Sequence, residues 1–352
     1  MKIALLTLPF VNNYGGILQA YALKHFLELR GHSVCIIDRN SNFKISFIDI
    51  LRLAKRKFLG NRIRNFAYFK KQYLLPMTSE IITNKEMLLL DEKYQFDIYI
   101  VGSDQVWRAI YYRDIKYNFY LDFVSSKRKI SFAASFGISS WEYTNTETDI
   151  IAKLLMDFSF VSVRADTAVR LCSDYLNINA VQFLDPTFLL DKNEYCCLAD
   201  CFYSSKKIDI FAYIMGPDSS KDKLIKIISD YSGLSVQSIT QSKFSFKKNE
   251  SIQEWLQNFY KSKFVVTDSF HGLAFSLIFN KPFIVCGFSN RGMGRYESLL
   301  RYFSLENRLL YSLEDLKELN LSTIWDINWK EVNAKIAENK RFVLELMQTV
   351  GV

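Results

Sequence analysis

Residues 264–285 read FVVTDSFHGLAFSLIFNKPFIV, and this stretch indicates the fold more clearly than any other part of the chain. The apolar run at 264–266 is typical of a buried strand, and a polar turn at 267–269 follows it directly. His271 then falls in the first turn of an apolar helix, and a second strand begins near Pro282. In an open α/β sheet, ligands bind beyond the carboxyl ends of the strands, where loops lead into helix N-termini. The stretch therefore predicts a parallel sheet with His271, one of three histidines, at its ligand-binding edge.

Apolar runs alternate with amphipathic stretches along the chain, a pattern typical of parallel sheets covered by helices. A first series predicts strands at 2–8, 33–38, 96–101, 129–135, 160–163 and 180–184, and helices at 16–30, 144–157 and 165–175. A second series predicts strands at 208–214, 236–239, 264–266 and 281–286, and helices at 220–232, 252–261, 311–319 and 328–348. The polar stretch 191–207 separates the two series. We therefore predict an α/β protein with two Rossmann-like domains facing each other across a cleft, at residues 1–188 and 189–326, followed by a C-terminal helix at 327–352.

The composition is that of a globular protein with an ordinary core. The chain has 352 residues, of which 49% are hydrophobic and 23% are charged, so two domains are expected and disorder is not. The apolar N-terminal run breaks at Pro9, and no apolar run approaches about 18 residues, so we expect neither a signal peptide nor a membrane span. Six cysteines lack zinc-site spacing, and we expect reduced thiols, no metal site and a cytoplasmic location.

A basic segment at residues 52–71 contributes much of the net charge of +8. Phenylalanine and tyrosine residues are interleaved with its lysines and arginines, which suits an anionic membrane face or nucleic acid. No nucleic-acid-binding motif accompanies the segment, so we expect no nucleic-acid partner. The two remaining interpretations are peripheral contact with the inner membrane face and a solvated helix face beside a core.

A glycine pair follows the first predicted strand, in the sequence NNYGG at residues 12–16. Adjacent glycines let the backbone approach a ligand closely, and the helix that follows exposes N-terminal amides to an anion or to sugar hydroxyls. The third glycine of the dinucleotide pattern is missing. The alternative to a binding loop is a plain strand-to-helix turn. The predicted binding residues are Asn13, Tyr14, Gly15, Gly16 and Gln19.

A second polar motif, VGSDQVWR at residues 101–108, ends another predicted strand. Asp104 and Gln105 can bond sugar hydroxyls, and the indole of Trp107 offers an apolar face for a sugar ring. The alternative is that Asp104 only caps a helix.

Arg164 occupies a further junction between a predicted strand and helix. Its planar guanidinium can bind a carboxylate or a phosphate with two parallel hydrogen bonds. Pairing with Asp166, or with an aspartate elsewhere, is the alternative.

His271 is the predicted catalytic residue, because an imidazole titrates near neutral pH and can act as a general acid. Asp268 or Ser269 can orient the ring. Arg291 and Arg295, which are separated by glycines, can surround an anion. The alternative is a structural histidine whose hydrogen bonds are satisfied.

Taken together, NYGGILQAYAL, VGSDQVW, SFAASFG, VSVRADTA, FLDPTFLL and TDSFHGLAFSLIFNKPFIV resemble the polysaccharide pyruvyl transferase family, from residue 12 to about residue 294. The resemblance implies a glycosyltransferase-B-like fold. It also implies transfer of the pyruvyl group of phosphoenolpyruvate onto two hydroxyls of a sugar, as a cyclic ketal. The acceptor would be a cell-surface polysaccharide, such as a capsule or exopolysaccharide, or its lipid-linked precursor. Phosphoenolpyruvate would be a co-substrate, with no cofactor and no metal.

The resemblance also implies roles for particular residues. His271 corresponds to the family's histidine, expected to protonate the enol methylene, and Arg164 to an arginine expected to hold the donor's phosphate or carboxylate. Many family members have an arginine two residues before this histidine, where this chain has Ser269. Arg291 or Arg295 is expected to replace that cation, with Ser269 at the donor site.

Two aspartates, Asp104 and Asp268, are the expected proton acceptors for the sugar hydroxyls. We expect the acceptor on the first domain and the donor on the second. Two other functions stay open: a nucleotide-sugar glycosyltransferase with the same fold, and a non-catalytic glycan-binding relative. The missing arginine at Ser269 is the main support for the last of these.

Overall fold

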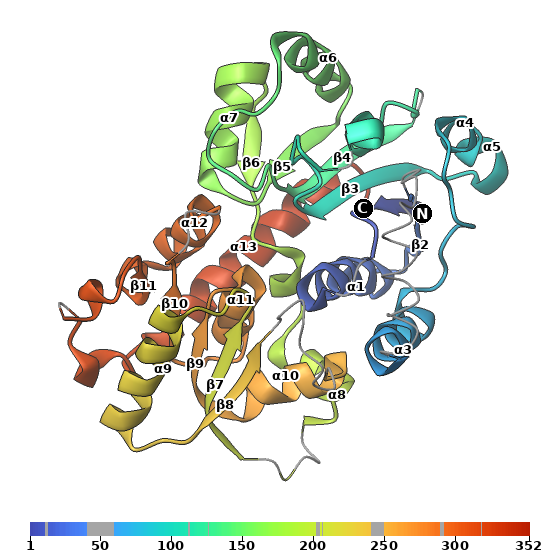
Figure 1. Cartoon of the computed structure of the whole chain (residues 1–352). Coiled ribbons are helices and arrows are strands. Elements are labelled where there is room, and N and C mark those ends of the chain that lie inside the picture. Colours follow the sequence, from blue (N-terminus) through green and yellow to red (C-terminus); the bar gives the residue numbers. More distant parts are fainter. Residues whose placement is uncertain are drawn as a thin grey trace, which may run out of the picture. The chain divides into compact units, whose positions relative to one another are not determined.

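The computed structural model describes residues 1–10, 13–40, 60–111, 113–125, 127–201, 205, 207–240, 250–288, 292–317 and 319–352. The chain divides into two compact units (Figure 1). Unit 1 comprises Met1–Leu189 and Asn339–Val352, and unit 2 comprises Leu190–Glu338. The predicted boundaries had placed the division after residue 188 and treated 327–352 as a segment of its own.

The C-terminal helix α13 (Trp329–Thr349) corrects the second of these boundaries, because it belongs to both units. Its final turns pack into unit 1, where Val343 and Met347 are buried. Asn339 Oδ1 accepts a hydrogen bond from the backbone N–H of Leu184 (3.3 Å), and Arg128 donates to the carbonyl oxygen of Val350. The end of the helix is thus part of the core of unit 1.

Unit 1 contains a six-stranded parallel sheet in the order β2-β1-β3-β4-β5-β6. Its strands are β1 (Lys2–Leu6), β2 (Ser33–Ile36), β3 (Ile98–Asp104), β4 (Arg128–Ala134), β5 (Phe160–Val163) and β6 (Ala180–Gln182). Its helices are α1 (Tyr14–Glu28), α3 (Gly60–Phe69), α4 (Asn84–Leu88), α5 (Leu90–Tyr94), α6 (Asn145–Met156) and α7 (Asp166–Leu176). A π-helical turn (Lys70–Leu74) and 3-10 turns (Arg113–Tyr120 and Pro186–Leu189) complete it.

Unit 2 contains a five-stranded parallel sheet in the order β11-β10-β9-β7-β8. Its strands are β7 (Ile208–Ile214), β8 (Val236–Thr240), β9 (Ser262–Thr267), β10 (Phe283–Cys286) and β11 (Leu309–Leu310). Its helices are α8 (Lys192–Leu198), α9 (Ser219–Ser232), α10 (Ile252–Lys261), α11 (Phe270–Ile278) and α12 (Gly294–Phe303). Short 3-10 turns occupy Glu306–Arg308, Glu314–Lys317 and Leu321–Thr323.

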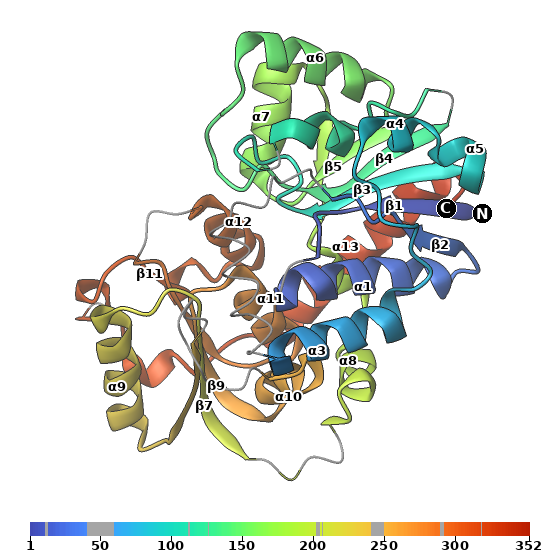
Figure 2. The same ribbon diagram turned by 45° about the vertical axis from the view of Figure 1, so that its right-hand side comes forward.

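Local sequence explains where many of the helices begin. Capping boxes start α6 at Thr144 and α10 at Ser251, with Glu147 and Glu254 three residues later. The apolar residues of α1 lie on all sides of the helix, and most of it is buried. Figure 2 shows α3 lying beside α1, and the rings of Tyr14 and Phe66 meet at 5.0 Å.

One predicted helix is wrong. In the described part of 311–319, which lacks residue 318, the helical element is the 3-10 turn Glu314–Lys317. The carboxylate of Asp315 accepts the backbone N–H groups of Tyr311 and Ser312, which favours a tight turn over a continuing helix.

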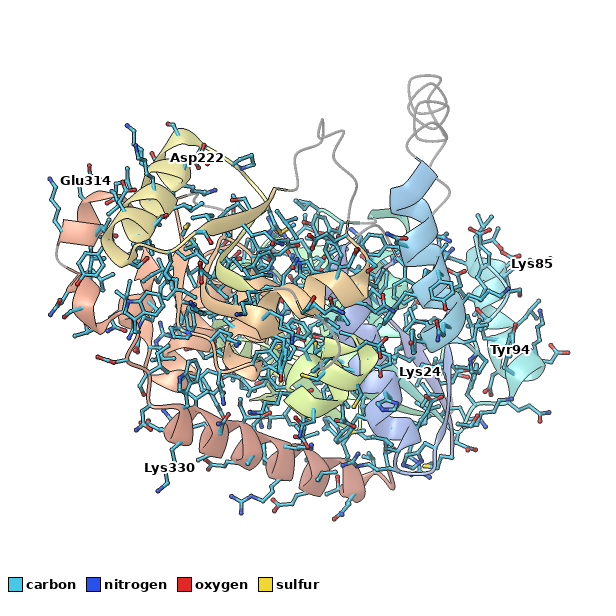
Figure 3. The ribbon with its side chains drawn as sticks, turned by 90° about the horizontal axis from the view of Figure 1, so that it is seen from below. Lys24, Lys85, Tyr94, Asp222, Glu314 and Lys330 are labelled. Carbon is cyan, nitrogen blue, oxygen red and sulfur yellow. The ribbon has the colours of Figure 1, made fainter. Side chains whose placement is uncertain are left out.

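Many charged side chains lie at the surface. Figure 3 shows Asp222 of α9, Glu314 and Lys330 of α13 at the surface of unit 2. Among the helices that the structure describes, none is both long enough and apolar enough to span a bilayer.

Candidate active site

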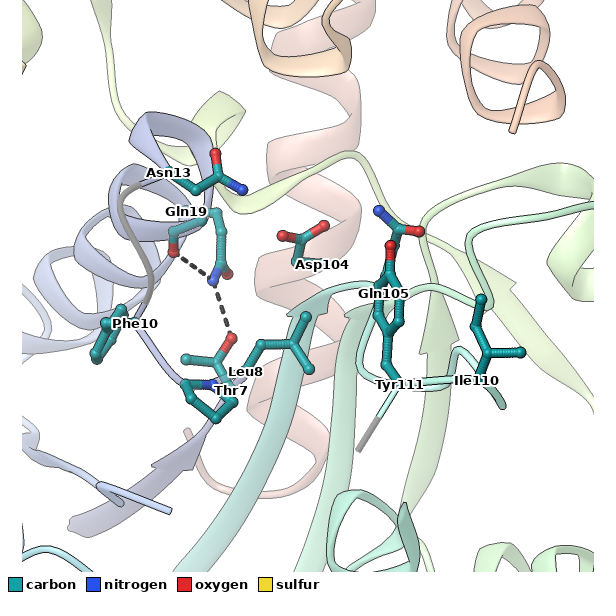
Figure 4. Close-up of a pocket in the computed structure, with 11 residues that line it drawn as sticks. Thr7, Leu8, Phe10, Asn13, Gln19, Asp104, Gln105, Ile110 and Tyr111 are labelled. Atoms are coloured by element: carbon teal, nitrogen blue, oxygen red, sulfur yellow. Dashed lines mark hydrogen bonds between the residues drawn. The ribbon is translucent and has the colours of Figure 1, made fainter. Parts of the chain in front are cut away.

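The strand order of unit 1 reverses between β1 and β3, the position at which open α/β sheets bind ligands. A cavity of about 400 Å³ lies there. Figure 4 shows Asn13 entering it from the start of α1 and Asp104 from the end of β3. The cavity is lined by Thr7, Leu8, Pro9, Phe10, Asn13, Gly16, Gln19, Asp104, Gln105, Ile110 and Tyr111.

Gln19 connects the three elements that form this cavity. Its side-chain amide nitrogen donates to Thr7 Oγ1 (3.0 Å) and to the carbonyl oxygen of Gly16 (2.9 Å). Its oxygen accepts the backbone N–H of Ser103 (3.0 Å). Gln19 is only 1% exposed, so these bonds hold β1, α1 and β3 together at the cavity wall.

Asp104 belongs to a buried group of three charged side chains at the ends of β3, β5 and β6. Arg164 lies between two carboxylates, with Nη1 2.9 Å from Asp185 Oδ2 and Nη2 3.4 Å from Asp104 Oδ1. Asp185 Oδ1 also accepts the backbone N–H and the hydroxyl of Thr187. Of the alternatives for Arg164, pairing with aspartates other than Asp166 is the arrangement observed.

The residues predicted to bind the acceptor divide into those at the cavity and those in the packing. Asn13, Gly16, Gln19 and Gln105 line the cavity. Asn13 also caps α1, since its Oδ1 accepts the backbone N–H of Gly15 (3.1 Å). Tyr14 and Gly15 are both buried, and the Tyr14 side chain is only 1% exposed.

The prediction that Trp107 packs on a sugar ring is wrong. Its side chain is 0% exposed and stacks on Tyr120, with 5.2 Å between the ring centroids. Its indole N–H donates to the carbonyl oxygen of Phe119 (2.8 Å). The chain turns this residue into the core of unit 1, where its large apolar surface contributes to stability.

In unit 2 the corresponding reversal of strand order lies between β7 and β9. Asp268 follows β9, and its two oxygens accept the backbone N–H groups of Met215 (2.6 Å) and Gly216 (2.9 Å) after β7. Lys221 Nζ lies 2.9 Å from Asp268 Oδ2. The carboxylate is therefore engaged in joining the ends of β7, β9 and α9.

His271 lies in the first turn of α11 and is 7% exposed. Ser269 caps this helix, with its hydroxyl accepting the backbone N–H of Gly272 (3.3 Å). A Cβ on Gly272 would lie 2.2 Å from Thr267 Oγ1, so glycine lets α11 approach the end of β9 closely. Asp268 thus joins strand ends and Ser269 caps the helix, and their orientation of the imidazole stays a prediction.

Arg295 of α12 lies close to the start of α11. Its guanidinium carbon is 6.0 Å from the centre of the Phe270 ring, which meets the His271 ring edge-on. The neighbouring Tyr296 hydroxyl donates to the carbonyl oxygen of Asp268 (2.8 Å). Unit 2 therefore brings together four of the predicted residues, Asp268, Ser269, His271 and Arg295. Arg291 lies outside the described residues, and Arg164 belongs to unit 1.

Lys221 is the charged residue of this site that sequence reasoning missed. Burial by itself lowers the pKa of Lys221, but hydrogen bonds and charge from Asp268 and Asp218 outweigh burial and raise the pKa above its ordinary value of 10.5. A signal was present: Lys221 shares the buried face of α9 with Leu224, Ile225 and Ile228. A lysine at that position of an apolar stripe needs a buried partner.

Neither unit shows a metal-ligand cluster in its described residues, because no three His, Cys, Asp or Glu side chains come together suitably there.

The fold of the chain is that of known sugar-nucleotide enzymes. UDP-GlcNAc 2-epimerase from Methanocaldococcus jannaschii is 12% identical with a TM-score of 0.57, covering 99% of this chain and 100% of its own. The enzyme from Rickettsia bellii is 9% identical with a TM-score of 0.53, covering 99% and 96%. The Neisseria meningitidis enzyme, bound to UDP-GlcNAc, is 10% identical with a TM-score of 0.52, covering 99% and 100%. These likenesses define a glycosyltransferase-B-like α/β protein.

The family assignment is independent of that likeness. The model of the family described as polysaccharide pyruvyl transferase matches residues 13–290. The chain therefore belongs to the polysaccharide pyruvyl transferase family, and it is a transferase. None of the curated protein sequences matches it.

Proposed function

We propose that the protein transfers the pyruvyl group of phosphoenolpyruvate onto two hydroxyls of one sugar, forming a ketal and releasing phosphate. The observation that carries this proposal is the place of His271, in the first turn of α11 at the carboxyl end of β9. Family membership supports pyruvyl transfer to a polysaccharide.

The reaction needs one acid, a proton acceptor and positive charge. His271 donates a proton to C3 of the enol, which leaves an oxocarbenium-like centre at C2. One sugar hydroxyl forms a C–O bond to C2, and the second hydroxyl closes the ring as the C–O bond to phosphate breaks. The two hydroxyl protons balance the new methyl hydrogen and the phosphate. Asp104 accepts a hydroxyl proton, because it lines the cavity of unit 1.

Asp268 has a different role in this proposal from that of Asp104. Both of its oxygens hold fixed donors, so it positions the start of α11 instead of accepting a proton from substrate. The donor's negative charge is met by Arg295, whose guanidinium lies near Phe270. Arg291 is the second cation in this assignment, by its sequence position. Ser269 belongs to the donor site in this assignment and caps α11.

The acceptor sugar binds in the cavity of unit 1. Asn13, Asp104 and Gln105 offer hydroxyl partners, and Phe10 and Tyr111 offer apolar faces. The acceptor is a surface polysaccharide of the capsule or exopolysaccharide type, or its lipid-linked precursor.

We also propose peripheral contact with the inner face of the membrane through the basic segment 52–71. Residues 52–59 lie outside the described residues. In the described part, Phe66 and Phe69 are buried in unit 1, while Tyr68 is 63% exposed and Lys71 is exposed. Sedimentation with anionic and with neutral vesicles tests this contact: equal binding to both would refute it.

The central experiment measures phosphate release and pyruvyl mass gain with phosphoenolpyruvate and a panel of glycan acceptors. His271→Ala should lower turnover by about 10²- to 10⁴-fold, the usual loss on removing a general acid. His32→Ala, in unit 1, is the matched control and should retain turnover. Unchanged turnover in His271→Ala would refute the assigned acid. Stabilisation by UDP or GDP species, without an effect of phosphoenolpyruvate, would favour a nucleotide-sugar glycosyltransferase. Sugar binding without any turnover would favour a non-catalytic relative.

A further inference from the structure

The described lining of the cavity of unit 1 contains one acidic residue and no basic one, and Lys70 Nζ lies outside the lining, 5.1 Å from the ring centre of Phe10. Of the described residues that line the cavity, Asp104 is the acidic one. Its other polar side chains are neutral, namely Thr7, Asn13, Gln19, Gln105 and Tyr111. Asparagine and glutamine amides can donate to or accept from a hydroxyl, whereas an ionised carboxylate only accepts.

The positive charge of Arg164, which lies next to Asp104, does not neutralise both of the carboxylates that it contacts. Arg164 bonds Asp185 at 2.9 Å and Asp104 at 3.4 Å, so one guanidinium lies between two carboxylates. The three side chains together retain one net negative charge. The side chains of Arg164 and Asp185 are 2% and 0% exposed, so solvent screens this charge weakly.

The second carboxylate oxygen of Asp104 faces the glycine loop. Asp104 Oδ2 is 3.7 Å from the position that a Cβ on Gly16 would occupy. Asp104 lies at the end of β3 with a φ of +67°, in the left-handed region that non-glycine residues seldom adopt. Arg164 holds one oxygen of Asp104, which leaves the other directed toward the start of α1.

We propose that this cavity selects an uncharged sugar ring, excludes anionic ligands, and is kept in shape by Arg164 acting as a positioning residue for Asp104. Uronic acids and phosphoenolpyruvate are therefore excluded from it, because a second negative charge near Asp104 is repelled. Calling the sugar the acceptor rests on the proposed function; the charge selectivity does not.

The test measures sugar binding by ligand-observed NMR without phosphoenolpyruvate. The probes are methyl glycosides of glucose, galactose and mannose, their N-acetylamino counterparts, and the matching methyl uronides at neutral pH. Neutral glycosides should bind about tenfold more tightly than their uronides. Asp104→Asn should bring this ratio toward one. Asp174→Asn makes the same charge change at an exposed position of α7 outside the cavity, and should leave the ratio unchanged.

Variants behind the cavity test the positioning role. Asp185 is not among the residues that line the cavity, but Asp185→Asn removes the excess negative charge and should weaken discrimination against uronides. Arg164→Lys retains the cation and should retain the ratio. If Arg164 and Asp185 only stabilised the fold, their variants would weaken the binding of neutral and charged sugars equally. That result would overturn this part of the proposal.

Three results would overturn the selectivity. They are uronides that bind as tightly as neutral sugars, phosphoenolpyruvate that competes with neutral sugars for unit 1, and no neutral binding up to the solubility limit. Discrimination between neutral sugars and uronides without pyruvyl transfer would support the cavity assignment and reject the proposed function. Pyruvyl transfer without this discrimination would support the proposed function and reject the cavity assignment.

Discussion

The first three strands have the same order in both units, but the aspartate at the end of the third strand has different contacts in each. The first strand lies between the second and third in both sheets, as β2-β1-β3 and as β8-β7-β9. An aspartate ends or follows the third strand in each. Asp104 of unit 1 faces a cavity, whereas Asp268 of unit 2 accepts two backbone N–H groups and pairs with Lys221.

The difference shows that a carboxylate at this position is not a ligand group by virtue of the fold alone. Asp268 has donors fixed on both oxygens, so it joins strand ends. The Oδ2 atom of Asp104 lies beside Gly16, which has no side chain, so a ligand can approach this oxygen. Four variants test this contrast.

Arg164→Met should have the largest effect on stability. It leaves Asp104 and Asp185 close together and buried without their cation, so we expect unit 1 to lose about 3–5 kcal/mol of unfolding free energy. Urea unfolding followed by circular dichroism measures this loss. Arg170→Met, at an exposed position of α7, is the control. A loss below about 1 kcal/mol would mean that the charged triad is not a buried unit.

Lys221→Met should have a smaller effect, in unit 2. Asp268 would lose its cation but keep the N–H groups of Met215 and Gly216, so we expect a loss of about 2–3 kcal/mol. Lys223→Met, exposed on the same helix, should be nearly neutral. If the two variants unfold at the same urea concentration, the Asp268–Lys221 pair does not stabilise unit 2.

The same lysine predicts a pH dependence. Its pKa is raised in the folded state, so its contribution to stability is complete below 10.5 and is lost as pH rises through the folded-state pKa. The difference in unfolding midpoint between the wild type and Lys221→Met should therefore shrink at pH above 10.5. A difference that stays constant from neutral to strongly alkaline pH would contradict the charge contribution and leave packing as the cause.

The glycines near the start of α1 and α11 give the smallest pair of effects. A Cβ on Gly272 would lie 2.2 Å from Thr267 Oγ1, so Gly272→Ala should cost about 1–3 kcal/mol. On Gly16 the nearest atom would be Asn13 Nδ2 at 3.4 Å, so Gly16→Ala should change stability by no more than about 0.5 kcal/mol. Gly16→Ala should nevertheless weaken sugar binding, because the methyl group enters the cavity. Thermal unfolding of both variants measures the stability changes, and glycoside titration measures sugar binding. A smaller loss of stability in Gly272→Ala than in Gly16→Ala would contradict the prediction.

Much of the fold could be predicted because its signals are local. Strands at 160–163 and 208–214 and the helix at 252–261 coincide with β5, β7 and α10. The division of α13 between the units was missed, because periodicity identifies a helix but not the core against which each turn packs. The turn within 311–319 was missed, because it depends on hydrogen bonds from nearby backbone N–H groups to one side chain, Asp315.

The site was predicted less completely, since it depends on contacts between distant residues. The loops around Gly16, Asp104 and His271 were located from strand ends, glycines and polar residues. The direction of Trp107 into the core and the partners of Arg164 could not be predicted that way. The buried lysine on α9 was visible in the pattern of that helix and was overlooked.

The order of apolar and polar segments by itself determined two parallel-sheet units with polar loops after their strands, because strand and helix periodicities and turn residues act over a few neighbours. Only the tertiary structure decided which polar residue faces a cavity and which is engaged by the protein itself. That choice depends on the partners that distant segments bring to each carboxylate: Arg164 with one oxygen left for a ligand at Asp104, and Lys221 with two backbone amides at Asp268.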